Sequence, residues 1–154
     1  MSFVHDKAVV IGDVKMGEEC SVWPCAVIRG DRSSIRIGKC SNIQDNADIH
    51  TDSTHKVEIG DYVTIGHGAI VHGCKIADKV MIGMGAIVLN GAEIPENVIV
   101  AAGTVVPENE KLEPNSVYMG VPAKKAREIR PREEGYIVEN ATGYWELAQS
   151  YLKK

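Results

Sequence analysis

The chain has 154 residues and a formal net charge of −4. This length suits one domain, and mild acidity without a long basic run argues against nucleic-acid binding. No segment approaches the roughly 20 apolar residues that a membrane-spanning helix needs, and the N-terminal residues lack the pattern of a signal peptide. We therefore expect a cytoplasmic protein that binds neither nucleic acid nor membrane.

Aromatic residues make up only 5% of the chain, whereas glycine and aliphatic residues are abundant. This composition predicts a core of many small, similar layers. None of the four cysteines forms a Cys-x-x-Cys pair, which argues against a redox motif or a cysteine-rich zinc site. We expect all four to be buried side chains in a reducing compartment: Cys20, Cys25, Cys40 and Cys74.

Aliphatic residues recur every six positions along most of the chain. A period of six fits neither an α-helix nor strand alternation, but it fits a triangular coil in which each hexad forms a short strand and a corner. Three hexads then close one coil, and coils stack about 4.8 Å apart, as neighbouring strands do. The inward-pointing residues would be Val10, Met16, Val22, Ile28, Ile37, Ile43, Ile49, Ile59, Ile65, Val71, Ile76, Ile82, Val88, Ile94, Val100, Val106 and Leu112.

The period slips at three places. The steps from residue 28 to 37 and from residue 49 to 59 are longer than six, which predicts small loops at corners. Residues 51–55 have the composition of such a loop. The step from Val71 to Ile76 is one residue short.

The hexads stop after residue 122, which separates a β-helix region, residues 1–122, from a tail, residues 123–154, within a single domain. Pro131 and the acidic residues after it suit a helix start. Apolar residues then recur at helical spacing, which predicts an amphipathic helix over residues 132–152 that packs along the prism. Its apolar positions are Ile137, Ala141, Tyr144, Ala148 and Tyr151, with Leu147 alongside.

The period also predicts neighbours in adjacent coils. Arg29, His50 and His72 each follow an inward residue at equivalent positions, so they should stack in one outward column. Asp45 and His67 should stack in a second column. His67 should point away from the other two histidines of its own subunit, and a threefold assembly would bring it to the pair on a neighbour.

Two imidazoles about 5 Å apart can share a metal ion at about 2.0–2.1 Å from each nitrogen. Three nitrogen ligands with one open position are typical of a catalytic metal site. The alternative is that these histidines are solvated surface residues. His5 and His55 have no such register, and we expect them to be ordinary surface residues.

Several motifs together resemble γ-class carbonic anhydrases, which are hexapeptide-repeat proteins. They are Arg29-Gly30-Asp31, Asn42-Ile43-Gln44-Asp45, His50, His67-x4-His72 and Gly120-Val121-Pro122-Ala123-Lys124. The resemblance implies a left-handed parallel β-helix of hexapeptide repeats with a C-terminal α-helix. The handedness comes from the resemblance alone, since parallel crossovers are usually right-handed.

The resemblance further implies a homotrimer that binds zinc, or iron or cobalt, between subunits. His50 and His72 would come from one subunit and His67 from the next. The activity implied is that of a lyase, the reversible hydration of CO2 to bicarbonate by a metal-bound hydroxide. Three further residues resemble the family's interface ion pairs: Arg29, Asp31 and Asp45.

Gln44 and Asn42 resemble the polar groups that orient the hydroxide in this family. Tyr144 or Asn140 on the tail helix would approach the site, unless Tyr144 simply packs on the prism. Two glutamates that carry protons in archetypal members are missing. Arg32 stands at the first place, and Asp52 is the sole acid of the loop at the second, which argues against fast turnover.

Two alternatives remain open at this point. One is a γ-carbonic-anhydrase-like metal protein with negligible CO2 activity that serves binding or assembly. The other is a CoA-dependent acyltransferase on the same fold, with one histidine as general base and a CoA groove between subunits. Three histidines placed for one metal argue against the second, because one base would suffice.

Overall fold

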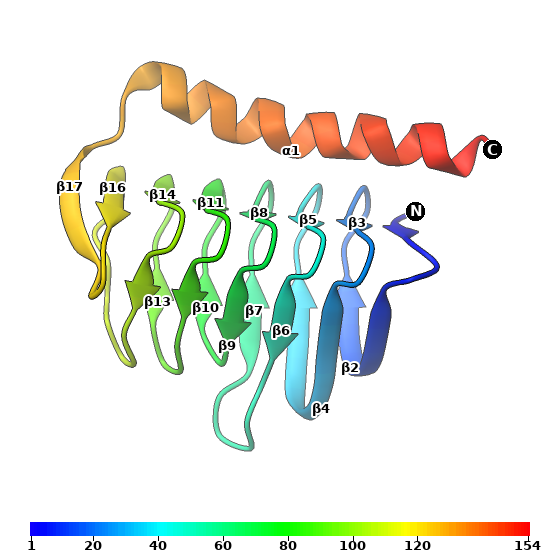
Figure 1. The fold of residues 1–154 in the computed structure, drawn as a ribbon, viewed down its shortest axis with the longest axis horizontal. Coiled ribbons are helices and arrows are strands. Elements are labelled where there is room, and N and C mark those ends of the chain that lie inside the picture. Colours follow the sequence, from blue (N-terminus) through cyan, green and yellow to red (C-terminus); the bar gives the residue numbers. More distant parts are fainter.

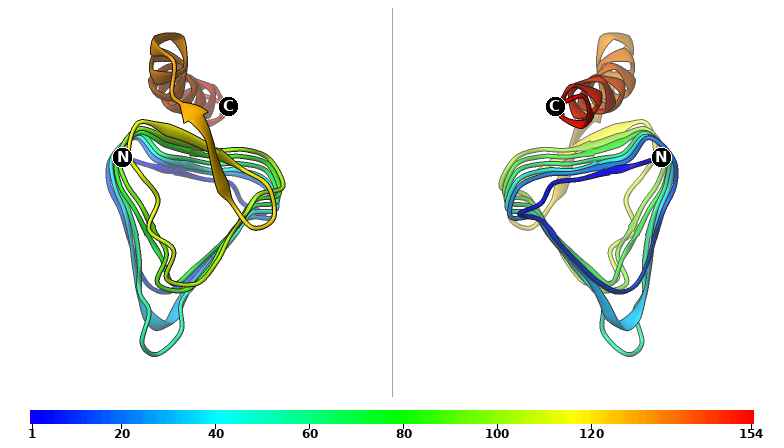
Figure 2. Two further views of the ribbon diagram at one scale, coloured as in Figure 1. Left: turned by 90° about the vertical axis from the view of Figure 1, so that its left-hand side faces the viewer. Right: turned by 90° about the vertical axis from the view of Figure 1, so that its right-hand side faces the viewer.

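The computed structural model describes residues 1–154. It is a left-handed parallel β-helix, a triangular prism with the single helix α1 (Pro131–Leu152) lying along one side (Figures 1 and 2). The N-terminus lies at one end of the prism, and the last coil leads through a short strand back to the helix. The predicted fold class is therefore confirmed, including the helix, which begins and ends within one residue of its expected bounds.

The strands form three faces. We name one for the helix that covers it and the other two for the chemistry of their outward side chains. The helix-covered face contains β1 (Phe3–Val4), β3 (Ser21–Val22), β5 (Asn42–Ile43), β8 (Thr64–Ile65), β11 (Val80–Ile82), β14 (Val98–Val100), β16 (Ser116–Met119) and, antiparallel to β16, β17 (Lys124–Glu128). The sequence did not lead us to expect β17, because it lies beyond the last hexad.

The other two faces share the long strands β2 (Val9–Met16) and β4 (Val27–Ile37), which bend around a corner. The aliphatic face continues with β6 (Asp48–His50), β9 (Ile70–His72), β12 (Ile87–Val88) and β15 (Val105–Val106). The charged face continues with β7 (Val57–Ile59), β10 (Lys75–Ile76) and β13 (Glu93–Ile94).

The core is a stack of the predicted hexad residues, which are buried from Val22 to Leu112. Alanines occupy the tight corners between faces and are also fully buried, for example Ala26 and Ala86. Each buried isoleucine or valine contributes roughly 1.5–3 kcal/mol. The first coil departs from the prediction, because Val10 is 37% exposed. No earlier coil covers it at the end of the stack.

Of the two long steps in the period, only the second is a loop. Residues 51–56 leave the prism between β6 and β7 as predicted, and the loop projects from the corner (Figure 1). The predicted loop between residues 28 and 37 is instead a bulge within the continuous strand β4, which pairs with β2 on either side while residues 31–34 have no partner there. Gly12 permits this close pairing, since a Cβ at that position would lie 2.4 Å from the Gly30 carbonyl oxygen.

The outward side chains differ sharply between the two faces that the helix leaves uncovered. Aliphatic residues follow one another across the aliphatic face in paired register: Val9, Val27, Ile70, Ile87 and Val105 in one column, interrupted only by Asp48. The corresponding column of the charged face is Lys15, Arg36, Glu58, Lys75 and Glu93. Charged side chains favour solvent, whereas a contiguous aliphatic surface favours burial.

Helix α1 packs through Ile137, Ala141 and Ala148, which are buried as predicted. Tyr151 and Leu147 are instead 44% and 47% exposed, although the Tyr151 ring still stacks against Phe3 with 5.7 Å between ring centroids. A capping box at Glu133 starts the helix. The helix has no apolar stretch that could cross a lipid bilayer.

Candidate metal centre

His50 and His72 end two neighbouring strands of the aliphatic face. β6 and β9 pair in parallel with His50 directly opposite His72, which confirms that the two belong to one column. Their rings lie with centroids 5.1 Å apart. The Nδ1 atom of His50 is 3.2 Å from the Nε2 atom of His72.

The outer nitrogen of each ring contacts an oxygen acceptor. Nε2 of His50 lies 3.0 Å from the Asp31 carboxylate, and Nδ1 of His72 lies 2.6 Å from Oδ1 of Asn90. Both outer nitrogens therefore carry the proton when the imidazoles are neutral. The two inner nitrogens are then unprotonated and lie 3.2 Å apart.

This arrangement fits a zinc-class metal ion. A tetrahedral ion bound at about 2.0–2.1 Å requires its two nitrogen ligands to be about 3.3 Å apart, close to the separation observed. Oxygen acceptors on the outer nitrogens are the usual second contacts of metal-ligating histidines. His50 and His72 are thus suited to hold one ion together.

His67 lies at the other edge of the aliphatic face, in the corner turn that precedes β9. Its Nδ1 atom is 3.1 Å from the Asp45 carboxylate, and its side chain is 45% exposed. Within one chain no three His, Cys, Asp or Glu side chains are grouped so that they could hold a metal ion. The single chain therefore presents two histidines at one edge of the face and the third at the opposite edge.

Asp31 contacts two of the residues that the sequence singled out. Its Oδ2 accepts a hydrogen bond of 2.7 Å from the Arg29 guanidinium, while Oδ1 contacts His50. The hydrogen bond from Arg29, followed by that from His50, holds the pKa of the Asp31 carboxyl below its ordinary value. Asp31 and Asp45, which the resemblance assigns to interface ion pairs, each contact a histidine of the same chain.

Gln44 and Asn42 belong to a chain of hydrogen bonds beneath helix α1. Nε2 of Gln44 donates to Oδ1 of Asn42 at 3.0 Å, and Nδ2 of Asn42 donates to the Thr64 hydroxyl at 2.9 Å. The same hydroxyl accepts a hydrogen bond of 2.9 Å from Asn140 on α1. This series of hydrogen bonds fixes the orientation of the Gln44 amide. Its Oε1 accepts no hydrogen bond within the protein.

A hollow of about 240 Å³ lies between the helix-covered face and α1. Gln44, His67, Asn140 and Tyr144 all line it, so both candidate helix residues reach the neighbourhood of one predicted ligand. Burial, with a smaller contribution from the Asp45 carboxylate, raises the pKa of Tyr144. His50 and His72 do not line this hollow.

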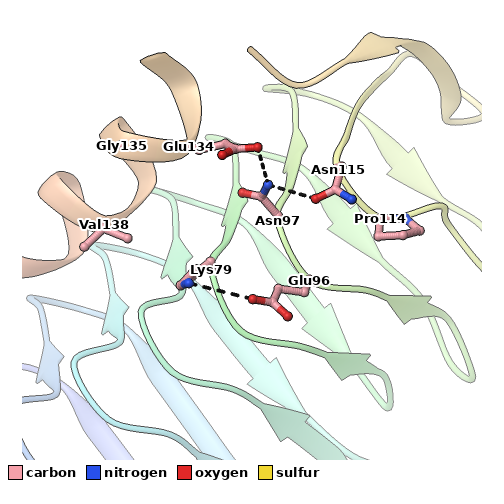
Figure 3. A pocket seen from close by; sticks show the side chains of 8 residues that line it. All are labelled: Lys79, Glu96, Asn97, Pro114, Asn115, Glu134, Gly135 and Val138. Carbon is pink, nitrogen blue, oxygen red and sulfur yellow. Dashed lines mark hydrogen bonds and ion pairs between the residues drawn. The ribbon is translucent and has the colours of Figure 1, made fainter. Parts of the chain in front are cut away.

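A larger hollow of about 480 Å³ lies nearer the start of α1 (Figure 3). Its lining is polar, and Asn97 bridges Asn115 and Glu134 within it. Lys79 and Glu96 form a 3.8 Å ion pair on its wall. None of the residues that the sequence analysis singled out lines it, so this hollow is separate from the candidate metal centre.

Two residues near the centre were missed by sequence reasoning. Asn90 contacts His72, and Thr64 joins Asn42 to Asn140. Asn90 stands one coil after His72, so the hexad count itself could have placed it there. The role of Thr64 depends on which way α1 packs, and the period carries no signal for that.

Comparison with known proteins agrees with this architecture. The family described as bacterial transferase hexapeptide (six repeats) matches residues 73–108. A protein named probable carbonic anhydrase from Methanocaldococcus jannaschii is 48% identical over 93% of this chain and 90% of its own. The solved hexapeptide transferase family protein from Anaplasma phagocytophilum is 34% identical, with a TM-score of 0.88 over 97% of this chain and 92% of that one.

The mitochondrial γ carbonic anhydrase 1 of Arabidopsis thaliana is 40% identical over 97% of this chain. The match covers 57% of the plant protein, so the chain spans little more than half of that relative's length. The archaeal relative, named a probable carbonic anhydrase, matches over nearly the whole of both chains. The chain therefore belongs to the γ-carbonic-anhydrase-like family of hexapeptide-repeat β-helix proteins.

Proposed function

We propose that this protein catalyses the reversible hydration of CO2 to bicarbonate at metal sites between the subunits of a homotrimer. The observation that carries the proposal is the 3.2 Å separation of the inner nitrogens of His50 and His72, whose outer nitrogens both face oxygen acceptors. Zinc is the first candidate, with iron or cobalt as alternatives: imidazole suits zinc and iron, and the family resemblance implies cobalt as well. A bound ion of this kind lowers the pKa of water from 15.7 to about 7, which is the chemistry that CO2 hydration requires.

Threefold assembly is supported by the aliphatic face. Its outward column of valine and isoleucine side chains includes Ile70, which is 40% exposed in the single chain. The same face has His50 and His72 at one edge and His67 at the other, so the site of a single chain is incomplete. Packing this face against two further copies would bury the aliphatic surface and bring His67 of one subunit to the pair of the next.

The residues around the site would then divide the remaining tasks. Asp31 holds His50 by its outer nitrogen, and Asp45 does the same for His67. Gln44 presents a free amide oxygen in the hollow that His67 lines. That oxygen can accept a hydrogen bond from a reacting water and orient it toward CO2. Tyr144 and Asn140 close the hollow from the side of α1 and limit access of bulk water.

The site lacks a side chain suited to carry the proton of each catalytic cycle to solvent. The Arg32 side chain, at the first place where relatives carry a glutamate, cannot accept a proton near neutral pH. Asp52 at the second place is engaged by the backbone amides of Thr54 and His55 and by Asn90. This supports slower turnover than that of members that retain both glutamates.

The deciding experiment measures metal and activity on the same samples. Protein reconstituted anaerobically with zinc and, separately, with iron should bind about one ion per subunit, elute as a trimer and accelerate CO2 hydration. A trimer that binds metal but leaves the hydration rate at the uncatalysed level would instead support the binding or assembly role. The similar Anaplasma protein is named a hexapeptide transferase family protein, so acyl transfer is the alternative activity to test. Acyl transfer from CoA by metal-free protein would support that activity and contradict the proposal.

A further inference from the structure

We propose that Asp52 sets the tautomer of His72 through the side-chain amide of Asn90, and so makes Nε2 of His72 a metal-binding lone pair. The inference rests on the proposed function, because a metal ion is what that lone pair would bind. Asp52 touches no ligand itself. It is a positioning residue that acts across Asn90.

The first step concerns the orientation of the Asn90 amide. Nδ2 of Asn90 donates a 2.9 Å hydrogen bond to Oδ2 of Asp52. An ionised carboxylate can only accept, so the amide nitrogen must face Asp52. The amide oxygen then faces His72, where it lies 2.6 Å from Nδ1. An amide oxygen can only accept, so Nδ1 of His72 must carry the proton.

The second step concerns what holds Asp52 in place. Oδ1 of Asp52 accepts hydrogen bonds from the backbone amides of Thr54 and His55 at 2.8 and 2.7 Å. The preceding residue, Thr51, is fully buried, and its hydroxyl both accepts from and donates to the backbone of Ser33 on β4. The loop of residues 51–56 is therefore a clamp on the carboxylate, and its hydrogen bonds hold the pKa of Asp52 well below the ordinary value.

The third step concerns the close approach of the clamp to His72. Gly73 follows His72 directly and has a φ of +55°. A Cβ at this position would lie 2.3 Å from Oδ1 of Asn90 and 2.6 Å from Cβ of His55. Only glycine leaves room for both groups, so the one-residue contraction of the period at this corner brings Asn90 and the loop against the ligand.

The tautomers of the two histidines are thus fixed in different ways. The outer nitrogen of His50 faces the Asp31 carboxylate directly, and a carboxylate has no donor, so its tautomer is fixed. The outer nitrogen of His72 faces an amide, which can present either a donor or an acceptor. A second residue must therefore decide which way the amide points, and Asp52 is that residue.

The substitution Asp52→Asn tests the proposal. The amide oxygen of the introduced asparagine can keep the hydrogen bonds from the loop backbone. Its amide nitrogen then faces Nδ2 of Asn90. Two donors repel, so the Asn90 amide should rotate and present its nitrogen to His72. The proton of His72 should then move to Nε2, where it blocks the metal. The change preserves every side chain near the ligand in size and shape.

The measurement uses metal-free protein with ¹⁵N-labelled histidine at about pH 9, well above the ordinary histidine pKa of about 6.5. In the native sequence, His72 should show a protonated Nδ1 and an unprotonated Nε2, and in the Asp52→Asn protein the assignment should reverse. Competition with a chelator should show zinc affinity falling roughly 10–100-fold, as for other second contacts of metal ligands.

Asp61→Asn is the matched control. Asp61 is another corner aspartate whose carboxylate accepts a hydrogen bond from a backbone amide, that of Lys39, and it contacts no histidine. It should leave both the tautomer and the affinity unchanged. Asn90→Ala should weaken zinc binding to a similar extent and leave His72 without a preferred tautomer. A circular dichroism spectrum like that of the native protein confirms that each variant folds.

Two results would overturn the proposal. One is a native His72 that carries its proton on Nε2. The other is an Asp52→Asn protein whose tautomer is unchanged, even if its affinity falls, because the loss would then reflect only the removed charge. The tautomer measurement needs no metal. If the native protein binds neither zinc, iron nor cobalt, the proposed function fails while this inference is still decided.

Discussion

His50 and His72 stand 22 residues apart in the chain, yet their facing ring nitrogens are 3.2 Å apart. The spacing exceeds one regular coil because the loop of residues 51–56 lies between them. Parallel pairing of β6 with β9 restores the register on the far side of that loop. The site therefore depends on backbone pairing that brings the second histidine back into line, and the following predictions test what that alignment serves.

Replacing His50, His67 or His72 with alanine, one at a time, should remove most of the bound metal. Two remaining imidazoles cannot fill the coordination sphere of a catalytic zinc site, which uses three protein ligands. Metal per subunit, measured by mass spectrometry after gel filtration, checks the prediction. His5→Ala is the control. Full metal retention in the His67→Ala protein would exclude the three-ligand site.

Mixed trimers should recover part of the lost metal binding. A subunit with His67→Ala still offers His50 and His72, and a subunit with His72→Ala still offers His67. Certain interfaces between the two would hold all three ligands. Two affinity tags isolate the mixed species, whose metal content is compared with that of each parent. Purified mixed trimers without metal would refute a site shared between subunits.

Gln44→Ala should keep its metal and its oligomeric state but lose roughly 10²–10³ in hydration rate, as expected when one positioned hydrogen-bonding group is removed. The reason is the free Oε1 atom in the hollow beside His67. Stopped-flow hydration assays at matched metal occupancy measure the loss. A native rate in the fully loaded variant would show that Gln44 only packs beneath α1.

Thr64→Val should destabilise the fold by about 1–3 kcal/mol for each buried donor left without its acceptor. The Thr64 hydroxyl accepts from both Asn42 and Asn140, whose amides would lose their partner. Urea unfolding measures the change, and Thr64→Ser should recover most of it. Thr104→Val is the matched control, because the Thr104 hydroxyl is buried with no hydrogen-bond partner. Equal losses in the two valine variants would contradict the role of the Thr64 hydroxyl.

The start of α1 should lose stability in acid. Hydrogen bonds from the Arg127 guanidinium and then the Arg130 backbone lower the pKa of Glu133 from 4.5 to about 2. A lowered folded-state pKa gives stability that is present above about pH 4.5 and is lost as the pH falls toward about 2. Glu133→Gln should therefore lower the melting temperature near neutral pH and make little difference near pH 2. Glu139→Gln, at an exposed position of α1, should show no such dependence.

The six-residue period predicted most of the fold. It predicted the buried residues, the coil stacking and the column that joins His50 to His72, because each depends only on counting from one inward residue to the next. It missed the continuous path of β4, since a nine-residue step can close either as a loop or as a bent strand pair. The choice depends on the close approach of Gly12 to Gly30, which is a contact between coils.

The candidate site was less fully predictable. Its histidines follow from register, but the contacts of Asp31 and Asp45 with those histidines depend on side-chain rotamers. Asn140 reaches Thr64 because α1, which follows β17, packs against β8, and β17 has no hexad signal. The periodic part of the sequence determines where backbones lie, whereas these polar contacts depend on a non-periodic tail.

The unlike outward surfaces of the prism have a consequence for how far association can proceed. One side is already occupied by α1, and a second exposes a column of lysine, arginine and glutamate whose burial would cost solvation energy. That leaves the aliphatic face as the one side of the prism suited to burial between copies. Copies that meet head to tail through this face form a closed ring when the rotation between them closes and an open filament when it does not. The charged column therefore disfavours lateral association through a second face of the prism.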